Sequence, residues 1–406
     1  MIHQQLRRAA GAVSSAGMAL LAAALVLASA VVAAPASAAD SKALDAVGQP
    51  LGITTGPDGT LYVSDDAYAG AVNAYAPGET TPSRTIKTGR GPTSLAVTPD
   101  GTLYVAQSEG AQSQIGVVAT GAGEVSLVMK VTYGTHWLAV GPEGSLYVVN
   151  PDQDSVSVVK AGDAWVQRTI QAGPDPVRLA VAKDGTAYAA NELAGTVTVI
   201  PAGAPWPSRT IDVGAKAHPH GIAAAPDGTV YVANIMTNDV AVIEPGGTTV
   251  ARRIPVGQAP QEVLAAADGT VYVTNSLDDT VSVIPAGAAA ATRTVAAGDD
   301  PGRMAQRGDG SVVVVNRHSR SLTVLDGGPA GAVVAPATGG EEPAAAADGG
   351  ASDGASVAQA SFDVPVAAVA AGAGLGLLAS AAFLVVVLRR RRKTSGADGA
   401  EVWALD

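Results

Sequence analysis

Two histidines hold matching places in a sequence that repeats itself, and a glutamate lies close to that place in another copy. Together these three residues could form a metal or acid–base site. His136 and His220 each stand eight residues before a turn glycine, and Glu262 stands one place further along in the next copy. Imidazole and carboxylate groups together ligate metals and transfer protons near neutral pH. The sequence therefore makes His136, His220 and Glu262 candidates for such a site.

The spacing of these residues favours a simpler interpretation. The two histidines belong to alternate copies and lack the close spacing of a metal-ligand motif. We therefore favour histidines that cap a water-filled channel by hydrogen bonding, and we expect no bound metal or other cofactor. Trp137, Arg178 and Arg303 occupy the position next to the histidines and offer a binding site for an anionic or aromatic ligand.

Other catalytic and metal-binding motifs are missing from the sequence. There is no nucleophile elbow, phosphate-binding loop or HExxH, and no cysteine. Asn150, Asp152 and Asp154 resemble the start of a calcium loop, but Ser155 and Ala161 replace its required glycine and glutamate. The sequence favours a protein that is not an enzyme and leaves a lyase or hydrolase as the alternative.

These candidates are positioned by a repeat of 41 to 43 residues. Each copy carries a turn such as PDGT, PEGS or KDGT, and the segments on both sides of this turn are rich in β-branched residues. That period and composition fit one four-stranded blade of a propeller. Seven turn glycines mark seven copies: Gly59, Gly101, Gly144, Gly185, Gly228, Gly269 and Gly310. We predict an all-β, seven-bladed propeller of four-stranded antiparallel blades.

A single copy shows why the repetition is needed. Residues 221–225 read as the inner strand, 229–234 as the second, 240–245 as the third and 251–257 as the outer strand. Such a sheet has two apolar faces, and only neighbours packed in a closed ring bury both of them. A tyrosine recurs in the second strand of six copies, and we expect it to pack between blades.

The seventh copy has three clear strands and lacks an obvious fourth. Residues 42–47 resemble the end of a repeat, so we predict that they supply the outer strand of the last blade. Residues 331–335 are the alternative. In the first case the N-terminal segment closes the ring.

Both ends of the chain indicate an exported, anchored protein. Residues 1–39 combine Arg7 and Arg8, an apolar run and an Ala-Ser-Ala exit, which is typical of a signal peptide. Residues 366–388 are uncharged and long enough to span a bilayer, and the basic run 389–393 follows at once. We predict a single-pass plasma-membrane protein with its propeller outside the cell and its C-terminus in the cytoplasm.

These features divide the chain into five segments, each with its own composition. In order they are a signal peptide (1–39), the propeller (40–326), an Ala-, Gly- and Pro-rich flexible stalk (327–363), a transmembrane helix (364–388) and a short basic cytoplasmic tail (389–406).

The charge of the chain limits its partners. The net charge is −11, and the part between the signal and the span is more negative, near −15, because it holds 33 of the 36 acidic residues and 18 of the 25 basic ones. Such a surface repels phosphate backbones, so nucleic acid is not an expected partner. We expect a monomer that binds a surface protein, a cell-wall glycan or a small ligand.

Two family resemblances agree with this organisation. The runs YVAN (231–234), YVTN (272–275) and LYVVN (146–150) resemble the YVTN-family β-propeller repeats, which implies a microbial surface protein. The run LGITTGPDGTLYVSD (51–65) resembles repeats of the virginiamycin B lyases, which implies a seven-bladed propeller whose catalytic His and acid sit with a metal. The Trp-Phe pair of those repeats is absent from every copy here. The combined prediction is a cell-surface binding scaffold.

Overall fold

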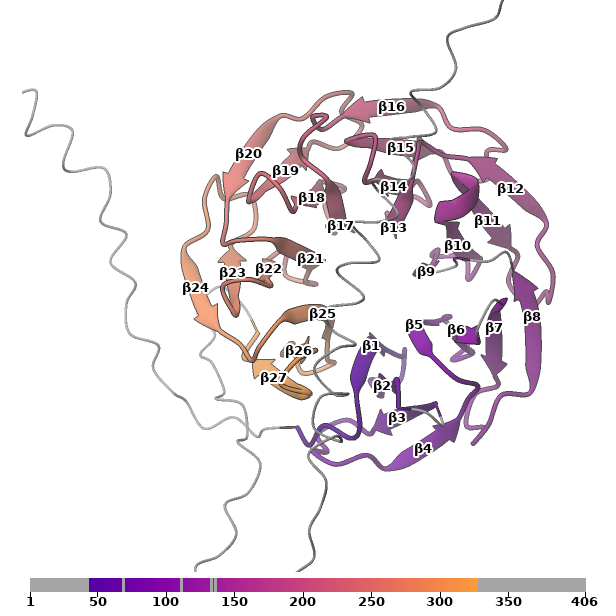
Figure 1. Cartoon of the computed structure of the whole chain (residues 1–406). Coiled ribbons are helices and arrows are strands. Elements are labelled where there is room, and N and C mark those ends of the chain that lie inside the picture. The colour runs from indigo at the N-terminus through magenta and orange to yellow at the C-terminus, as the bar shows by residue number, and fades with distance from the viewer. Residues whose placement is uncertain (1–43, 68–69, 110–111, 132–133, 135–136, 328–406) are drawn as a thin grey trace, which may run out of the picture. The chain divides into compact units, whose positions relative to one another are not determined.

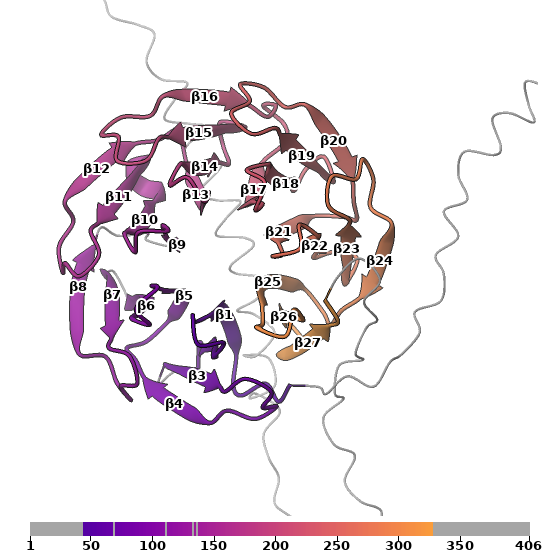
Figure 2. The same cartoon turned by 180° about the vertical axis from the view of Figure 1, so that it is seen from behind.

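The structure is a ring of seven antiparallel sheets around a central axis. It is a computed structural model that describes residues 44–327, except 68–69, 110–111, 132–133 and 135–136. Six sheets have four strands and the last has three, always in sequence order from the axis outwards (Figures 1 and 2). The predicted seven-bladed β-propeller is confirmed.

Each blade runs from an inner strand to an outer one. The inner strands are β1 (Pro50–Thr55), β5 (Pro92–Val97), β9 (Trp137–Val140), β13 (Pro176–Val181), β17 (Pro219–Ala224), β21 (Pro260–Ala265) and β25 (Pro301–Gln306). The second strands are β2 (Leu61–Asp65), β6 (Leu103–Glu109), β10 (Leu146–Asn150), β14 (Ala187–Asn191), β18 (Val230–Asn234), β22 (Val271–Asn275) and β26 (Val312–Asn316).

The outer half of each blade repeats the same way. The third strands are β3 (Ala71–Tyr75), β7 (Gln112–Val118), β11 (Ser155–Val159), β15 (Thr196–Ile200), β19 (Asp239–Ile243), β23 (Thr280–Ile284) and β27 (Ser321–Leu325). The outer strands are β4 (Arg84–Lys87), β8 (Leu127–Val131), β12 (Arg168–Gln171), β16 (Arg209–Asp212), β20 (Arg252–Pro255) and β24 (Arg293–Ala296). A short 3₁₀ helix, η1 (Pro151–Gln153), interrupts blade three.

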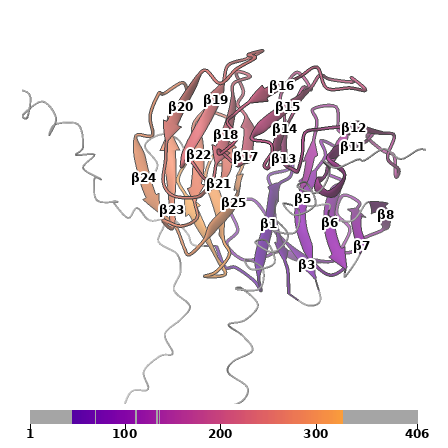
Figure 3. The same cartoon turned by 45° about the horizontal axis from the view of Figure 1, so that its top comes forward.

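The turn glycines set the two faces of the ring. Gly228 adopts a φ of +88°, and its amide donates to the carbonyl of Ala225, which closes the turn between β17 and β18. This left-handed conformation favours glycine, as the sequence predicted. We call the end where inner strands begin the channel mouth, and the end with these turns the opposite face (Figure 3).

The core lies between blades rather than in one centre. Tyr231 and Val240 of blade five pack with Val263 and Val273 of blade six, and all four are buried. The tyrosines at this position are buried in all six copies that have one. Their predicted packing between blades is confirmed, and it explains why one sheet does not suffice.

The N-terminal segment closes the last blade. Leu44 forms an antiparallel bridge with Leu322 of β27 and is only 3% exposed. The Asp45 carbonyl accepts a hydrogen bond from the hydroxyl of Tyr75 at 2.6 Å, which ties the segment to blade one. Leu44 therefore holds the outer position that the sequence assigned to residues 42–47. The alternative segment, 331–335, lies outside the described residues.

Gly221 allows two inner strands to approach closely at the channel mouth. A Cβ at this position would stand 2.7 Å from the Cα of Glu262 and 2.8 Å from the carbonyl oxygen of Gln261. Since both neighbours are backbone atoms, we expect Gly221→Ala to lower the free energy of unfolding by about 1–3 kcal/mol. Urea unfolding measures this loss. Gly123→Ala, where a Cβ meets open space, should change stability by less than about 0.5 kcal/mol.

Several predicted segments lie outside the described residues. These are the signal peptide, the stalk, the transmembrane helix and the basic tail. Within the part of the chain that the structure describes, no helix is long and apolar enough to cross a membrane.

Candidate functional site

Five of the six predicted site residues are described, and all five lie on inner strands at the channel mouth. Trp137 opens β9, Arg178 lies in β13, and His220 follows the first residue of β17. Glu262 and Arg303 are the third residues of β21 and β25. The inner strands surround the axis (Figure 1), and the contacts between these residues show that they lie close together. The sixth predicted residue, His136, lies outside the described residues.

Two arginines share one tryptophan. The guanidinium carbon of Arg178 lies 4.4 Å from the ring centroid of Trp137, and that of Arg303 lies 5.1 Å from it. The indole N–H donates to the carbonyl of Leu179 at 2.9 Å, which fixes the ring against blade four. Cations over an indole at such distances are attracted by its π electrons.

Glu262 supplies a buried counter-charge. Its carboxylate lies 3.5 Å from Nε of Arg178, and the two side chains are only 7% and 13% exposed. The Glu262 backbone amide donates to the hydroxyl of Thr274, which in turn donates to the carbonyl of Gly302. Blades four, six and seven are thereby linked across the mouth.

A third arginine stands beside this group. Arg317, in the loop after β26, pairs with Asp300 at 2.5 Å. Gly302 leaves room for it, because a Cβ there would meet Arg317 Nε at 3.3 Å. Arg303 in turn donates to the carbonyl of Thr93 in blade two, past blade one. Sequence reasoning noted the NRHSR loop on this face but did not select Arg317.

Burial makes charge costly at the mouth. Burial, together with the neighbouring charge of Arg178, lowers the pKa of Arg303 to about 9. Burial also lowers the pKa of Arg178 and raises that of Glu262, and in each case the partner's charge opposes the change. Both arginines remain cationic at neutral pH. Three guanidinium groups therefore meet two paired carboxylates, Glu262 and Asp300, and Glu192, described below, adds a partly ionised acid that acts on Arg178.

His220 is held neutral. Burial, followed by the charge of Arg178, lowers its pKa well below the ordinary value. Its Nδ1 lies 2.8 Å from the Gln261 carbonyl, and in the tautomer that this contact assigns, Nδ1 donates. This contact matches the predicted hydrogen-bonded role.

Glu192 is a second buried acid near the mouth, and sequence reasoning missed it. Burial, reinforced by the charge of Asp175, raises its pKa to about 7, although Arg178 opposes the rise. Its carboxylate lies 3.6 Å from Nδ1 of His218. The only sequence signal is its place in the NELAG loop after β14, which carries no pattern of its own.

We expect Glu192 to make stability depend on pH. The pKa of this carboxyl rises from 4.5 to about 7 on folding. As pH increases, the carboxyl therefore loses its proton at a lower pH in the unfolded chain than in the folded protein. Stability is therefore full below about pH 4.5 and falls as pH rises through 7. Between pH 5 and 8, wild type should lose about 2 kcal/mol relative to Glu192→Gln. Thermal melts of both proteins at unit pH steps measure it, and parallel curves would contradict it.

The described residues at the mouth do not fit a divalent cation. Glu262 is engaged by Arg178, and Arg303 and Arg317 add further positive charge. Among residues 44–327, with the gaps given above, no three His, Cys, Asp or Glu side chains gather closely enough to hold a metal. An arginine-rich cluster of this kind suits an anion instead.

Comparison with known proteins places this fold among lyases and other propellers. Residues 37–324 match the family model that is described as the virginiamycin B lyase family. No curated protein matches the sequence. The hydrazine synthase of Kuenenia stuttgartiensis is similar in structure, with 18% identity, a TM-score of 0.62, and coverage of 71% of this chain and 99% of that one.

Two solved lyase structures are also similar. A streptogramin B lyase matches with 15% identity and a TM-score of 0.59, covering 70% of this chain and 95% of its own. A virginiamycin B lyase from Staphylococcus aureus matches with 13% identity and a TM-score of 0.55, covering 68% and 93%. At such identities these structures are evidence for the fold alone. The virginiamycin B lyase resemblance is confirmed at the level of family, and the YVTN-family label stays a prediction.

Proposed function

This chain belongs to the virginiamycin B lyase family, and on that premise we propose that its propeller is a binding module whose channel mouth takes an anionic ligand. The observation that carries the proposal is the stack of Arg178 and Arg303 on Trp137, with Arg317 close by. Guanidinium groups match carboxylate and phosphate oxygens in geometry as well as in charge. An arriving anion would stabilise cations that burial penalises.

We propose that this module works outside the cell. The support is the sequence alone: an export signal over 1–39, and an apolar run over 366–388 followed by a basic cluster. A surface protein, a cell-wall glycan or a small ligand remains the proposed partner, and each of these can carry carboxylate or phosphate. Protease added to intact cells should release the propeller; a fully protected propeller would contradict this location.

Calorimetric titration tests the anion site. We expect the purified protein to bind benzoate or inorganic phosphate, and Arg303→Gln to weaken that affinity about tenfold or more. Arg320→Gln is the matched control, because it removes an exposed arginine from a loop of the same face. Equal affinity in wild type and Arg303→Gln would refute the site.

A lyase is the second candidate, and the family membership favours it. One solved structure of this kind is a catalytically inactive virginiamycin B lyase with quinupristin. We propose incubating the protein with quinupristin and divalent cations, and following the intact compound by chromatography. Loss of quinupristin that depends on Glu262 would establish the lyase. If quinupristin persists while benzoate or phosphate binds, the binding module stands.

A further inference from the structure

A second site lies on the opposite face, and the repeat itself reveals it. In five blades the outer strand begins with an arginine, which pairs in register with the third strand of the same blade. These residues are Arg84, Arg168, Arg209, Arg252 and Arg293. The shared position predicts a shared role.

That role is to bridge neighbouring blades. Arg168 donates to the carbonyl of Gly203 at 3.0 Å, in the turn between the third and outer strands of the next blade. Arg209 donates to the carbonyls of Gly246 and Gly247 at 3.3 and 3.2 Å, one blade further along. Arg168 and Arg209 therefore cross the groove between two blades, whereas Arg252 pairs with Glu244 of its own blade.

The same arginines stand near the interblade tyrosines. Their charges lower the phenol pKa that burial raises, as Arg84 does at Tyr62 and Arg168 at Tyr147. The groove between blades one and two shows the arrangement: a pocket of about 480 Å³ contains Arg84 together with Asp58 and Tyr62. In this groove a guanidinium of the chain itself thus supplies a positive charge beside the acid and the tyrosine.

Blade two breaks the pattern. Leu127 pairs with Val117 in the register that an arginine holds elsewhere. Gly162 of blade three occupies the place of Gly203, whose carbonyl accepts from Arg168 in the next groove. The acceptor side of the bridge is present between blades two and three, and the donor side is replaced by an apolar side chain.

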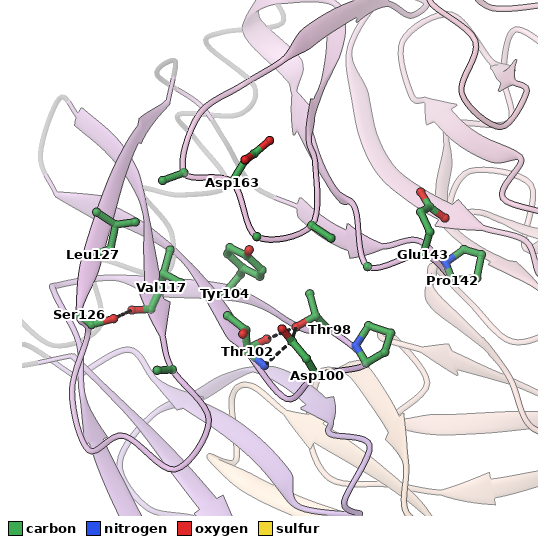
Figure 4. A pocket seen from close by; sticks show the side chains of 16 residues that line it. Thr98, Asp100, Thr102, Tyr104, Val117, Ser126, Leu127, Pro142, Glu143 and Asp163 are labelled. Carbon is green, nitrogen blue, oxygen red and sulfur yellow. Dashed lines mark hydrogen bonds between the residues drawn. The ribbon is translucent and has the colours of Figure 1, made fainter.

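The groove left between blades two and three is an acidic pocket. Its volume is about 390 Å³, and Asp100, Glu143 and Asp163 line it without any lysine or arginine (Figure 4). Asp100 accepts hydrogen bonds from Thr98 and Thr102, and Asp163 accepts one from Gln167. These donors are neutral, so the carboxylate charges stay uncompensated.

Tyr104 lies in the middle of this pocket with its hydroxyl free. The side chain is 3% exposed, and its phenol makes no hydrogen bond to any described residue. Burial raises its pKa, and the charges of Asp100 and Asp163 raise it further. The hydroxyl is therefore available to bond a ligand that enters the pocket.

The rim of the pocket indicates a protein partner. Leu127 and Val128 are each 44% exposed at the start of β8, and Trp165 next to the pocket-lining Ala164 is 62% exposed. The other outer strands begin with Arg-Thr or Arg-Arg at these two places. Apolar rims around a charged centre are typical of peptide recognition.

We propose that the groove between blades two and three binds the guanidinium of an arginine presented by a partner peptide with apolar neighbours. The ligand supplies the positive charge that Arg84, Arg168 or Arg209 supplies in the other grooves. Gly162, Asp163 and Tyr104 accept or share its hydrogen bonds, while Leu127 contacts a flanking apolar side chain. An organic cation fits better than a metal, because no described group of three acidic or histidine side chains is compact enough for one.

Fluorescence polarisation with short peptides tests this inference. The probe is a labelled peptide with one arginine between two leucines, and its partner probe has citrulline, which is isosteric and uncharged, in place of the arginine. We expect the arginine peptide to bind at least tenfold more tightly than the citrulline peptide. Leu127→Arg, which restores the repeat's own cation, should abolish binding and leave the fold intact by circular dichroism.

Two further variants separate charge from shape. Asp163→Asn should weaken the arginine peptide about tenfold. Arg307→Gln is the control and should leave its binding unchanged. Equal binding of the arginine and citrulline peptides, or undiminished binding to Leu127→Arg, would overturn the proposal.

Discussion

Replacing Glu262 with alanine is expected to lower the free energy of unfolding by about 3–5 kcal/mol. The carboxylate is the buried counter-charge of Arg178, and without it the guanidinium keeps its desolvation cost and loses its partner. The corresponding fall in melting temperature is about 10 °C for a domain of this size. Differential scanning calorimetry at pH 7 measures it directly.

An exposed ion pair provides the control for this prediction. Glu244 also contacts an arginine, Arg252, but its side chain is 52% exposed. Glu244→Ala should therefore change stability by less than about 1 kcal/mol. If Glu262→Ala lowers stability by less than about 1 kcal/mol as well, water in the channel, rather than Glu262, compensates the charge of Arg178.

Breaking the N-terminal closure should have an equally large effect. Leu44→Asp puts a carboxylate among Leu322, Val324 and Val315, in a cluster with no basic residue. We expect a loss of about 4 kcal/mol or more, because the substitution removes apolar contacts and buries an unpaired charge. Deletion of residues 40–48 should lower the melting temperature at least as much, since blade seven loses its outer pairing.

Val47 supplies the comparison for Leu44. It lies three residues further along and is 42% exposed, so Val47→Asp should cost less than about 0.5 kcal/mol. If the deletion leaves the melting temperature unchanged, the N-terminal segment does not close the ring, and residues 331–335 become the stronger candidate.

The fold was predictable because its signals are local and repeated. The turn at Gly228 and the buried tyrosine at Tyr231 recur with a fixed period, and a period of this length with strand-forming residues leaves few architectures. Even the closure by Leu44 was predictable, since residues 42–47 read like the end of a repeat. Such features depend on contacts within a blade or with the next blade, and these contacts recur in every copy of the repeat.

The site was predictable only in part, because it depends on contacts across the ring. The position that holds Trp137, Arg178 and Arg303 was found from the register of the repeats. Their stacking could not be found, since it joins blades three, four and seven around the axis. Arg317 and Glu192 come from loops whose lengths and shapes vary between copies, so no register selects them.

The groove between blades two and three shows the same limit of prediction from sequence. Leu127 replaces an arginine of the repeat, and this difference is visible when the copies are aligned. Its meaning depends on Gly203 and Gly246, whose carbonyls show what the other arginines bind. Those carbonyls lie on the neighbouring blade, so only the three-dimensional arrangement reveals that blade two lacks a donor.

The most direct measurement of the anion site is a crystal structure of the protein grown with 4-iodobenzoate. The iodine can be located from its anomalous signal alone. We predict one strong peak at the end of the channel where β13 and β25 begin, with the carboxylate against Arg178 and Arg303. An empty mouth in crystals that bind the compound elsewhere, or a divalent metal held there by His220 and Glu262 in preference to it, would contradict the account.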